Sequence, residues 1–139
     1  TKTTVSTGWE RADDATTGYI GDGVSESSGV FTLPSTGLYL VKFNFEAYDT
    51  GDIDYITIYV SGTSDNSSYD DLASSDFQLV NIASGQDYVS GCAHAFFNCT
   101  NTSTHKIKFQ IYGSQGFTLF GSTNTNATYG TFIRLGDST

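Results

Sequence analysis

The chain has 139 residues, a length that fits one domain able to bury a core of its own. Its net charge of −9, from 15 acidic and 6 basic residues, excludes the cationic surface with which proteins bind nucleic acids or anionic membranes. No apolar run approaches the roughly 18 to 20 residues of a membrane span, so we expect neither a transmembrane helix nor a signal peptide.

The residue types predict a nearly all-β protein. Aromatic residues make up 14% of the chain, Gly occurs 15 times, and long runs of helix-forming residues at helical spacing are missing. Residues 1–28 are polar with isolated anchors, and they predict one or two short strands and loops in which Trp9 closes one end of the core. Because the chain begins with Thr1, we expect it to be processed or cut from a longer protein.

Residues 29–48, GVFTLPSTGLYLVKFNFEAY, predict a short strand, a turn and a long aromatic strand. Pro34 fixes the backbone at the turn, and Gly37 relieves strain there. The long strand alternates, which places every second side chain on the same face. The face expected in the core carries Tyr39, Val41, Phe43, Phe45 and Ala47. The opposite face carries Leu38, Leu40, Lys42, Asn44, Glu46 and Tyr48.

Further strands follow at regular intervals. Residues 53–62, 88–99 and 106–113 alternate well, whereas residues 77–85 and 116–121 predict a weaker and a shorter strand. Within the strand at 88–99, Ala93, Ala95 and Phe97 are expected to face the core. Residues 129–136 predict the closing strand, on which we expect the inward side chains to be Tyr129, Thr131, Ile133 and Leu135.

These eight to ten strands, with turn residues between them, predict an antiparallel β-sandwich or jelly roll. We expect one domain over residues 1–139, with an N-terminal strand and loops in 1–28 and the main sandwich in 29–139.

The two cysteines, Cys92 and Cys99, are seven residues apart in one predicted strand. An odd separation puts their side chains on opposite faces, so a mutual disulfide would need a sharp bend between them. We therefore expect two free, mostly buried thiols rather than a disulfide framework.

Three motifs occur in an order that resembles a known superfamily. The first comprises Phe31, Pro34, Gly37, Leu38, Tyr39 and Phe43. The second is the pair of alternating strands in residues 90–114, and the third is Tyr129, Gly130, Thr131, Phe132 and Ile133. Together they resemble the complement subcomponent q globular heads and tumour necrosis factor. The resemblance implies a ten-stranded antiparallel jelly-roll β-sandwich that forms tight three-fold trimers. The Asn-, Thr-, Ser- and Gly-rich composition is closer to that of a bacteriophage or algal-virus structural protein.

Outward-facing apolar residues on neighbouring strands independently predict association, because such patches usually mark interfaces. We expect a trimer interface formed by Leu38, Leu40, Tyr48, His94, Phe96, Phe132 and Arg134. The alternative is that the N-terminal segment of the same chain covers these side chains. Arg134 is expected either to pair with an acid across the trimer axis or to be an ordinary exposed residue.

Acidic loops suggest a calcium site. Asp49, Asp52 and Asp54 place hard oxygen ligands in one turn, although they lack the complete loop of an EF-hand. Asp65, Asp70 and Asp71 form a second acidic loop. The alternative for both groups is solvated loop aspartates.

Outward tyrosines suggest a ligand surface. Aromatic faces stack on sugar rings, so we expect a surface for a glycan or protein receptor at Tyr55, Tyr59, Tyr69 and Tyr112. The alternative is ordinary scattered surface tyrosines.

Motifs for enzymatic chemistry are missing. The chain has two histidines, His94 and His105, and no nucleophile elbow, HExxH motif or phosphate-binding glycine loop. A lone histidine in a strand is usually a packing or interface residue. At a three-fold axis, His94 would make trimer stability depend on pH.

These patterns predict a non-enzymatic trimeric module exposed on a virion, as a fibre tip, a knob or a capsid decoration. It would serve host attachment or particle stabilisation, with no cofactor except a possible calcium ion. The alternative is a secreted or cell-surface binding domain of the complement-head type. A polysaccharide-cleaving enzyme is a more distant third hypothesis.

Overall fold

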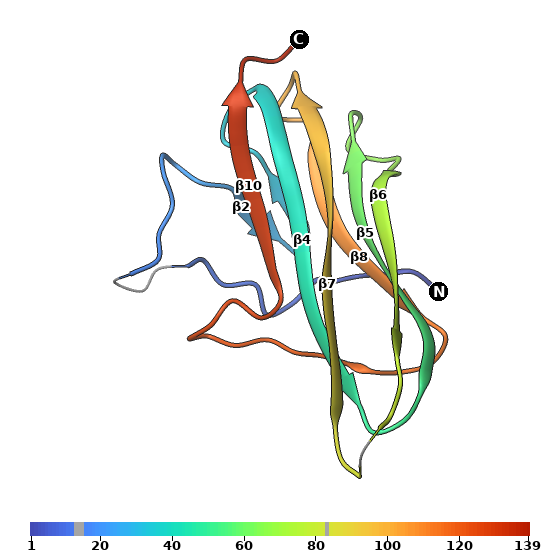
Figure 1. Ribbon diagram of the computed structural model, residues 1–139. Helices are drawn as coiled ribbons and strands as arrows, with labels where there is room; N and C mark the ends of the chain where they lie inside the picture. The colour runs from blue at the N-terminus through green and yellow to red at the C-terminus, as the bar shows by residue number, and fades with distance from the viewer. Residues whose placement is uncertain (13–15, 83) are drawn as a thin grey trace.

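The computed structural model describes residues 1–12, 16–82 and 84–139, and this part of the chain contains strands and no helix. Figure 1 shows two layers of antiparallel strands. In chain order they are β1 (Thr3–Thr4), β2 (Ser25–Ser27), β3 (Val30–Thr32), β4 (Gly37–Asp49), β5 (Ile53–Thr63), β6 (Asp70–Leu79), β7 (Asp87–Cys99), β8 (Lys106–Gly113), β9 (Thr118–Leu119) and β10 (Tyr129–Gly136). The ten-stranded antiparallel jelly roll predicted from the sequence is confirmed.

One layer is a six-stranded sheet and the other a four-stranded sheet. The six-stranded sheet has the order β2-β3-β8-β5-β6, with β1 also paired to β8. The four-stranded sheet has the order β10-β4-β7, with β9 also paired to β4. Strands that are distant in sequence are thus neighbours, and β4 lies between β7 and β10 at the centre of its sheet (Figure 1).

Along strand β4, buried and half-buried residues alternate from Gly37 to Tyr48, as expected of a strand with one face in the core. It pairs with β7 from Gly37–Cys99 to Asp49–Asp87, so the register is continuous along the whole strand. Every second side chain, from Tyr39 to Ala47, is almost fully buried. The core face predicted for this strand is confirmed.

The core between the sheets is built around a group of aromatic rings. Phe43 of β4 stacks on Phe109 of β8 with ring centroids 4.8 Å apart, and this contact joins the two sheets. Trp9 lies edge-on to Phe31 at 5.0 Å and donates a hydrogen bond of 2.7 Å from Nε1 to the Val5 carbonyl oxygen. The prediction that Trp9 packs on the core is therefore confirmed.

The turn between β3 and β4 is fixed by a side chain and by a close backbone approach. The Tyr39 hydroxyl donates to the Ser35 carbonyl oxygen at 2.9 Å. A Cβ atom at Gly37 would lie 2.7 Å from the Gly136 carbonyl oxygen. Glycine is therefore required where β4 and the end of β10 come together.

The predicted inward face of β10 is wrong, because the side chains expected to point outward lie on the core-facing side of the strand and those expected in the core point outward. Phe132 pairs with the buried Val41 and packs into the core, 5.3 Å from Phe31 and 5.7 Å from Phe109. Arg134 pairs with the buried Tyr39 and bonds the Thr36 carbonyl oxygen and Asp137. Neither residue lies on the outward face of the four-stranded sheet, where Tyr129, Thr131 and Ile133 lie instead.

The position of Gly130 explains why Phe132 faces the core. A Cβ atom at Gly130 would lie 2.4 Å from Cε2 of Phe109, so the Phe109 ring fills the space that a side chain would take there. Gly130 must therefore face the core, and Phe132, two residues later, faces it as well.

Strand β6 begins earlier than expected, because residues 70–79 form the strand in place of 77–85. Its sequence, DDLASSDFQL, is polar on the exposed face of a strand at the edge of its sheet. Phe77 supplies the inward contact, with its ring 4.9 Å from that of Phe45. Edge strands often carry charged residues of this kind, and these residues obscure the apolar alternation from which a strand is predicted.

The cysteines are free and lie on opposite faces, as the sequence predicts. Cys99 is buried, and this burial raises the pKa of its thiol. Cys92 is exposed, which corrects the expectation that both thiols are mostly buried.

The loop between β5 and β6 is organised by Asp65. Its Oδ1 atom accepts hydrogen bonds of 2.8 Å from the backbone N–H groups of Ser68 and Ser67 and from the Thr63 hydroxyl. These donors, with the Ser68 N–H as the largest contribution, hold the pKa of the Asp65 carboxyl well below its usual range. Asp65 therefore acts as the internal cap of this loop.

Replacing Phe132 by Ala should lower the free energy of unfolding by about 2–4 kcal/mol, because it removes a ring from the aromatic core. Thr131→Ala, on the opposite face of the same strand, is the matched control and should cost about 1 kcal/mol or less. Urea unfolding followed by tryptophan fluorescence measures both values. A larger loss for Thr131→Ala would contradict the observed phase of β10.

Replacing Asp65 by Asn should lower the melting temperature at pH 7, because the carboxylate hydrogen bonds are lost. A depressed pKa in the folded state stabilises the fold above the unfolded value of about 4, and this stabilisation disappears as the pH falls. The difference in melting temperature between the parent protein and Asp65→Asn should thus narrow below about pH 4. A difference that is the same at pH 7 and pH 3 would contradict this role. Asp70→Asn, at an exposed position of β6, is the control.

Candidate assembly and ligand surfaces

The outward face of the four-stranded sheet is divided into zones along its strands. Cross-strand partners share a face, so the register defines rows of side chains that run across β10, β4 and β7. The row Ile133–Leu40–Phe96 is apolar throughout. The next row, Thr131–Lys42–His94, is polar and carries the basic groups of this face.

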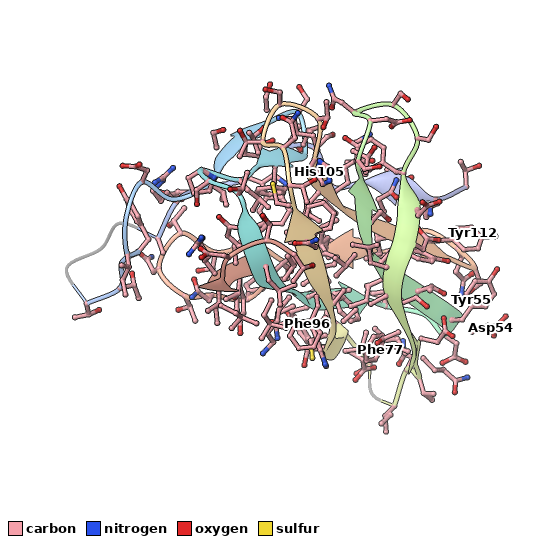
Figure 2. All side chains as sticks on the ribbon, turned by 90° about the horizontal axis from the view of Figure 1, so that it is seen from above. Asp54, Tyr55, Phe77, Phe96, His105 and Tyr112 are labelled. Atoms are coloured by element: carbon pink, nitrogen blue, oxygen red, sulfur yellow. The ribbon has the colours of Figure 1, made fainter. Side chains whose placement is uncertain are left out.

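We call the apolar zone the apolar band and define it by Leu38, Leu40, Phe96, Ile133 and Leu135. Phe96 is 65% exposed, Leu135 52% and Ile133 46%, although all three are large apolar side chains. The band crosses all three main strands of the sheet, so it is a contiguous patch rather than a set of isolated residues. Figure 2 shows Phe96 pointing away from the body of the sandwich.

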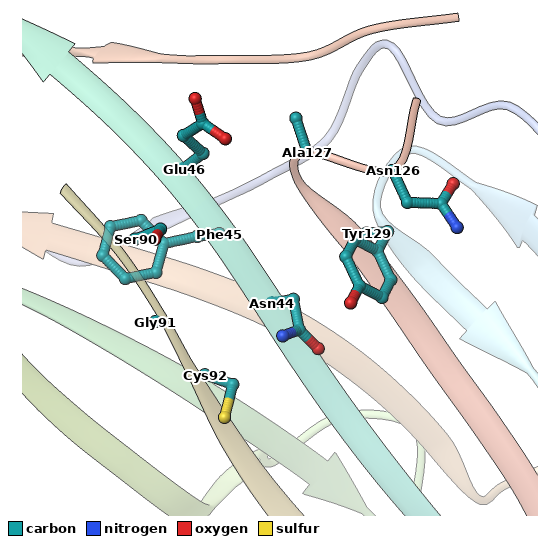
Figure 3. A pocket seen from close by; sticks show the side chains of 9 residues that line it. All are labelled: Asn44, Phe45, Glu46, Ser90, Gly91, Cys92, Asn126, Ala127 and Tyr129. Atoms are coloured by element: carbon teal, nitrogen blue, oxygen red, sulfur yellow. The ribbon is translucent and has the colours of Figure 1, made fainter. Parts of the chain in front are cut away.

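A shallow polar pocket of about 280 Å³ lies beyond the basic row (Figure 3). Asn44, Cys92 and Tyr129 form one row of its lining, with Glu46 and Ser90 next to them. The Oδ1 atom of Asn44 is buried, and no group of the described residues donates a hydrogen bond to it. A buried acceptor of this kind normally has a donor, so the pocket is suited to a polar group from outside the subunit.

The far end of the same face carries three rings in mutual contact. Tyr48 and Tyr88 are cross-strand partners with centroids 5.2 Å apart, and Phe120 lies 6.2 Å from each of them. Tyr88 is more than half exposed. We call these three residues the aromatic cluster.

Five of the seven residues predicted for a trimer interface lie on this outward face: Leu38, Leu40, Tyr48, His94 and Phe96. Phe132 and Arg134 do not. The sequence reasoning missed Ile133 and Leu135 because it assigned them to the core, and it missed Tyr88 and Phe120 because both lie near strand ends. Which side chains of β10 point outward is decided by the close approach of Gly130 to the Phe109 ring, and this contact is visible only in the structure.

The N-terminal strand does not cover this face. Strand β1 pairs with β8 in the six-stranded sheet, where Thr3 is opposite Ile111 and Thr4 is opposite Gln110. Lys2 forms an ion pair with Asp71 of β6. The described residues of the N-terminal segment thus leave Phe96 exposed, and the alternative of shielding by this segment is not supported.

The outward face of the six-stranded sheet is polar and tightly hydrogen-bonded. The buried Ser61 hydroxyl bridges Asp71 at 2.9 Å and Gln110 at 2.8 Å, and Gln110 donates to the Thr4 hydroxyl at 3.1 Å. Lys2 completes this chain by its ion pair with Asp71 at 2.5 Å. This face is therefore organised by polar contacts within one subunit and does not expose an apolar band.

The four tyrosines that were predicted to form a ligand surface lie on this polar face. Tyr55, Tyr59 and Tyr112 alternate outward on β5 and β8, and Tyr69 lies beside Lys108 of β8. The rings of Tyr55 and Tyr112 have centroids 5.6 Å apart, and the Tyr55 hydroxyl donates to the Tyr112 hydroxyl at 3.2 Å. This hydrogen bond is the main reason why the pKa of Tyr55 is raised.

The three aspartates predicted to bind calcium have separate contacts. Asp49 accepts from the Thr50 N–H at 2.5 Å, and Asp52 accepts from the Asn81 N–H at 2.7 Å. Asp54 is exposed next to Tyr55. In residues 1–12, 16–82 and 84–139, no three His, Cys, Asp or Glu side chains are close enough to hold a metal ion.

No helix with the length and hydrophobicity of a membrane span occurs among the described residues.

Comparisons with known proteins support the fold alone. No family model and no curated protein matches the sequence. Among solved structures, the crystal structure of murine APRIL at pH 5.0 matches with a TM-score of 0.57 and 18% sequence identity, over 83% of this chain and 79% of that chain. The strand order and this likeness together show that the chain adopts a tumour necrosis factor-like jelly roll.

Proposed function

We propose that the protein is a non-enzymatic homotrimeric binding module that acts outside cells, with the outward face of the four-stranded sheet buried between its copies. The apolar band carries this proposal, because Phe96, Ile133 and Leu135 are about half exposed or more in the single subunit. Fully burying one such side chain stabilises a protein by about 1.5–3 kcal/mol. Several of them in each of three copies can offset an association cost of about 4–15 kcal/mol.

A second copy of the chain suits this face better than a segment of the same chain. Strand β1 of the N-terminal segment pairs with β8 in the other sheet, and the tumour necrosis factor-like jelly roll supports assembly as a trimer. The buried Oδ1 atom of Asn44, which has no donor among the described residues, lies on the same face and is available to a donor from a neighbouring subunit. Both the apolar band and this acceptor thus favour contact with another copy.

The arrangement of reactive side chains favours binding over catalysis. His105 lies between the hydroxyls of Thr100 and Thr104, each 3.2 Å from one ring nitrogen, in the turn before β8. His94 lies beside Lys42 in the basic row. Neither histidine has a nucleophile and an orienting carboxylate among its hydrogen-bond partners in the described residues, which supports a non-enzymatic role.

As for where this module acts, our more specific hypothesis is the surface of a virion. There it would be a fibre tip, a knob or a capsid decoration that serves host attachment or particle stabilisation. The acidic, sulfur-poor and turn-rich composition supports it, since the chain has no Met, 2 Cys and a net charge of −9. A secreted or cell-surface domain recognising proteins or glycans is the alternative.

The native mass in solution tests the trimer. Light scattering at micromolar concentration should give about three times the chain mass of 14.9 kDa. Phe96→Asp should shift the protein to single subunits, because it places three carboxylates in the apolar contact. Val80→Asp, which changes a 53% exposed apolar residue outside this face, is the control and should leave the trimer intact. A parent protein with the mass of one chain would contradict the proposal.

A further inference from the structure

Tyrosines on the outward face of the six-stranded sheet hold lysine ammonium groups. Lys2 Nζ lies 4.5 Å from the centroid of the Tyr59 ring and forms its ion pair with Asp71. Lys108 Nζ lies 3.8 Å from the centroid of the Tyr69 ring. The sheet thus uses one arrangement twice, in which a lysine of the same chain lies over a tyrosine ring.

The Tyr55–Tyr112 pair is the exception. It lies on the same face, near the start of β5 and the end of β8, and Tyr55 is 37% exposed. Within residues 1–12, 16–82 and 84–139, no lysine or arginine is positioned over either ring. Figure 2 shows Tyr55 and Tyr112 at the periphery of the molecule with Asp54 beside them. The pair therefore has aromatic surface, on Tyr55 above all, that is open to solvent and carries no cation of the described residues.

Two carboxylates lie near this aromatic surface. Asp54 precedes Tyr55, and Asp76 lies in the row Asp76–Thr57–Tyr112, where it accepts a hydrogen bond of 2.5 Å from the Thr57 hydroxyl. Both aspartates are exposed. Two π-faces next to two carboxylates attract a cation by the ring quadrupoles and by charge.

We propose that the Tyr55–Tyr112 pair binds a lysine or arginine side chain of a partner protein, with Asp54 as its counter-ion. This inference rests on the proposed function, since it names the chemistry of the partner that the module recognises. The net charge of −9 supports it, because an acidic module is steered toward a basic partner surface. A neutral glycan is less well matched, because the two rings are tilted by 54° and their hydroxyls bond each other.

A peptide titration tests the inference. The probe is the acetylated and amidated tripeptide Gly-Lys-Gly, added to the full chain at low salt while the tyrosine ring resonances are followed by NMR. The matched probe Gly-norleucine-Gly has a similar aliphatic side chain without the charge. The lysine peptide should shift the resonances of Tyr55 and Tyr112 and the norleucine peptide should not, and added salt should weaken the effect.

Variants locate the site. Tyr55→Leu should weaken binding of the lysine peptide by about five-fold or more, and Asp54→Asn should weaken it by about two- to five-fold. Tyr112→Phe keeps the ring and should keep binding. The matched control is Tyr69→Leu, because Lys108 already lies over that ring. Should Tyr55→Leu fail to fold, the exposed Asp54→Asn still decides the question.

The outcomes of the titration test the cation site separately from the proposed trimer. Equal shifts with both peptides, binding that survives Asp54→Asn unchanged, or binding of the neutral sugar cellotriose in place of the lysine peptide would overturn the cation site. The mass of the same samples is measured by light scattering. A trimer without lysine binding overturns only the cation site, whereas a single subunit that binds lysine overturns only the proposed assembly.

Discussion

The structure depends on strand β4, because this central strand is apolar on one face and partly apolar on the other. Its core face, from Tyr39 to Ala47, is buried against the six-stranded sheet, and the stack of Phe43 on Phe109 fixes the contact between the layers. Continuous pairing with β7 and pairing with β10 fix its register. A slip by one residue would exchange the two faces, so Leu40 is held outward by the same pairing that buries Val41. The apolar band is thus a consequence of how the core is built.

The two outward faces of the sandwich differ in the kind of side chain that they expose. On the six-stranded sheet, Ser61 bonds Asp71 and Gln110 within one subunit, and Tyr55 of the Tyr55–Tyr112 pair is exposed. The four-stranded sheet leaves apolar side chains in water and an unpaired acceptor at Asn44. Our two proposals follow this contrast: association between copies on the four-stranded sheet, and recognition of a cationic partner on the six-stranded sheet.

Sequence reasoning succeeded where alternation was unambiguous. On β5, on β8 and on β4 from Val41 to Ala47, apolar and polar side chains alternate, so the inward sets followed directly from the period of two. On β10 both phases carry apolar residues, and the count of apolar residues favoured the wrong one. The deciding contact, between Gly130 and the ring of Phe109, joins residues from different sheets and has no local signal. The four tyrosines were correctly placed outward. The lysines over Tyr59 and Tyr69 are Lys2, which precedes β1, and Lys108 of β8, and only the three-dimensional fold brings them onto these rings.

The reactivity of Cys92 tests most directly whether sister copies cover the outward face of the four-stranded sheet. This thiol is exposed in the single subunit and lies in the row of Asn44 and Tyr129, whereas Cys99 is buried in the core and serves as an internal reference. We predict that Cys92 of the native protein at micromolar concentration reacts slowly with a maleimide reagent, and that Phe96→Asp makes it react rapidly while Cys99 stays protected. Labelling of Cys92 in the folded parent protein at the rate of an unstructured cysteine peptide would contradict the account.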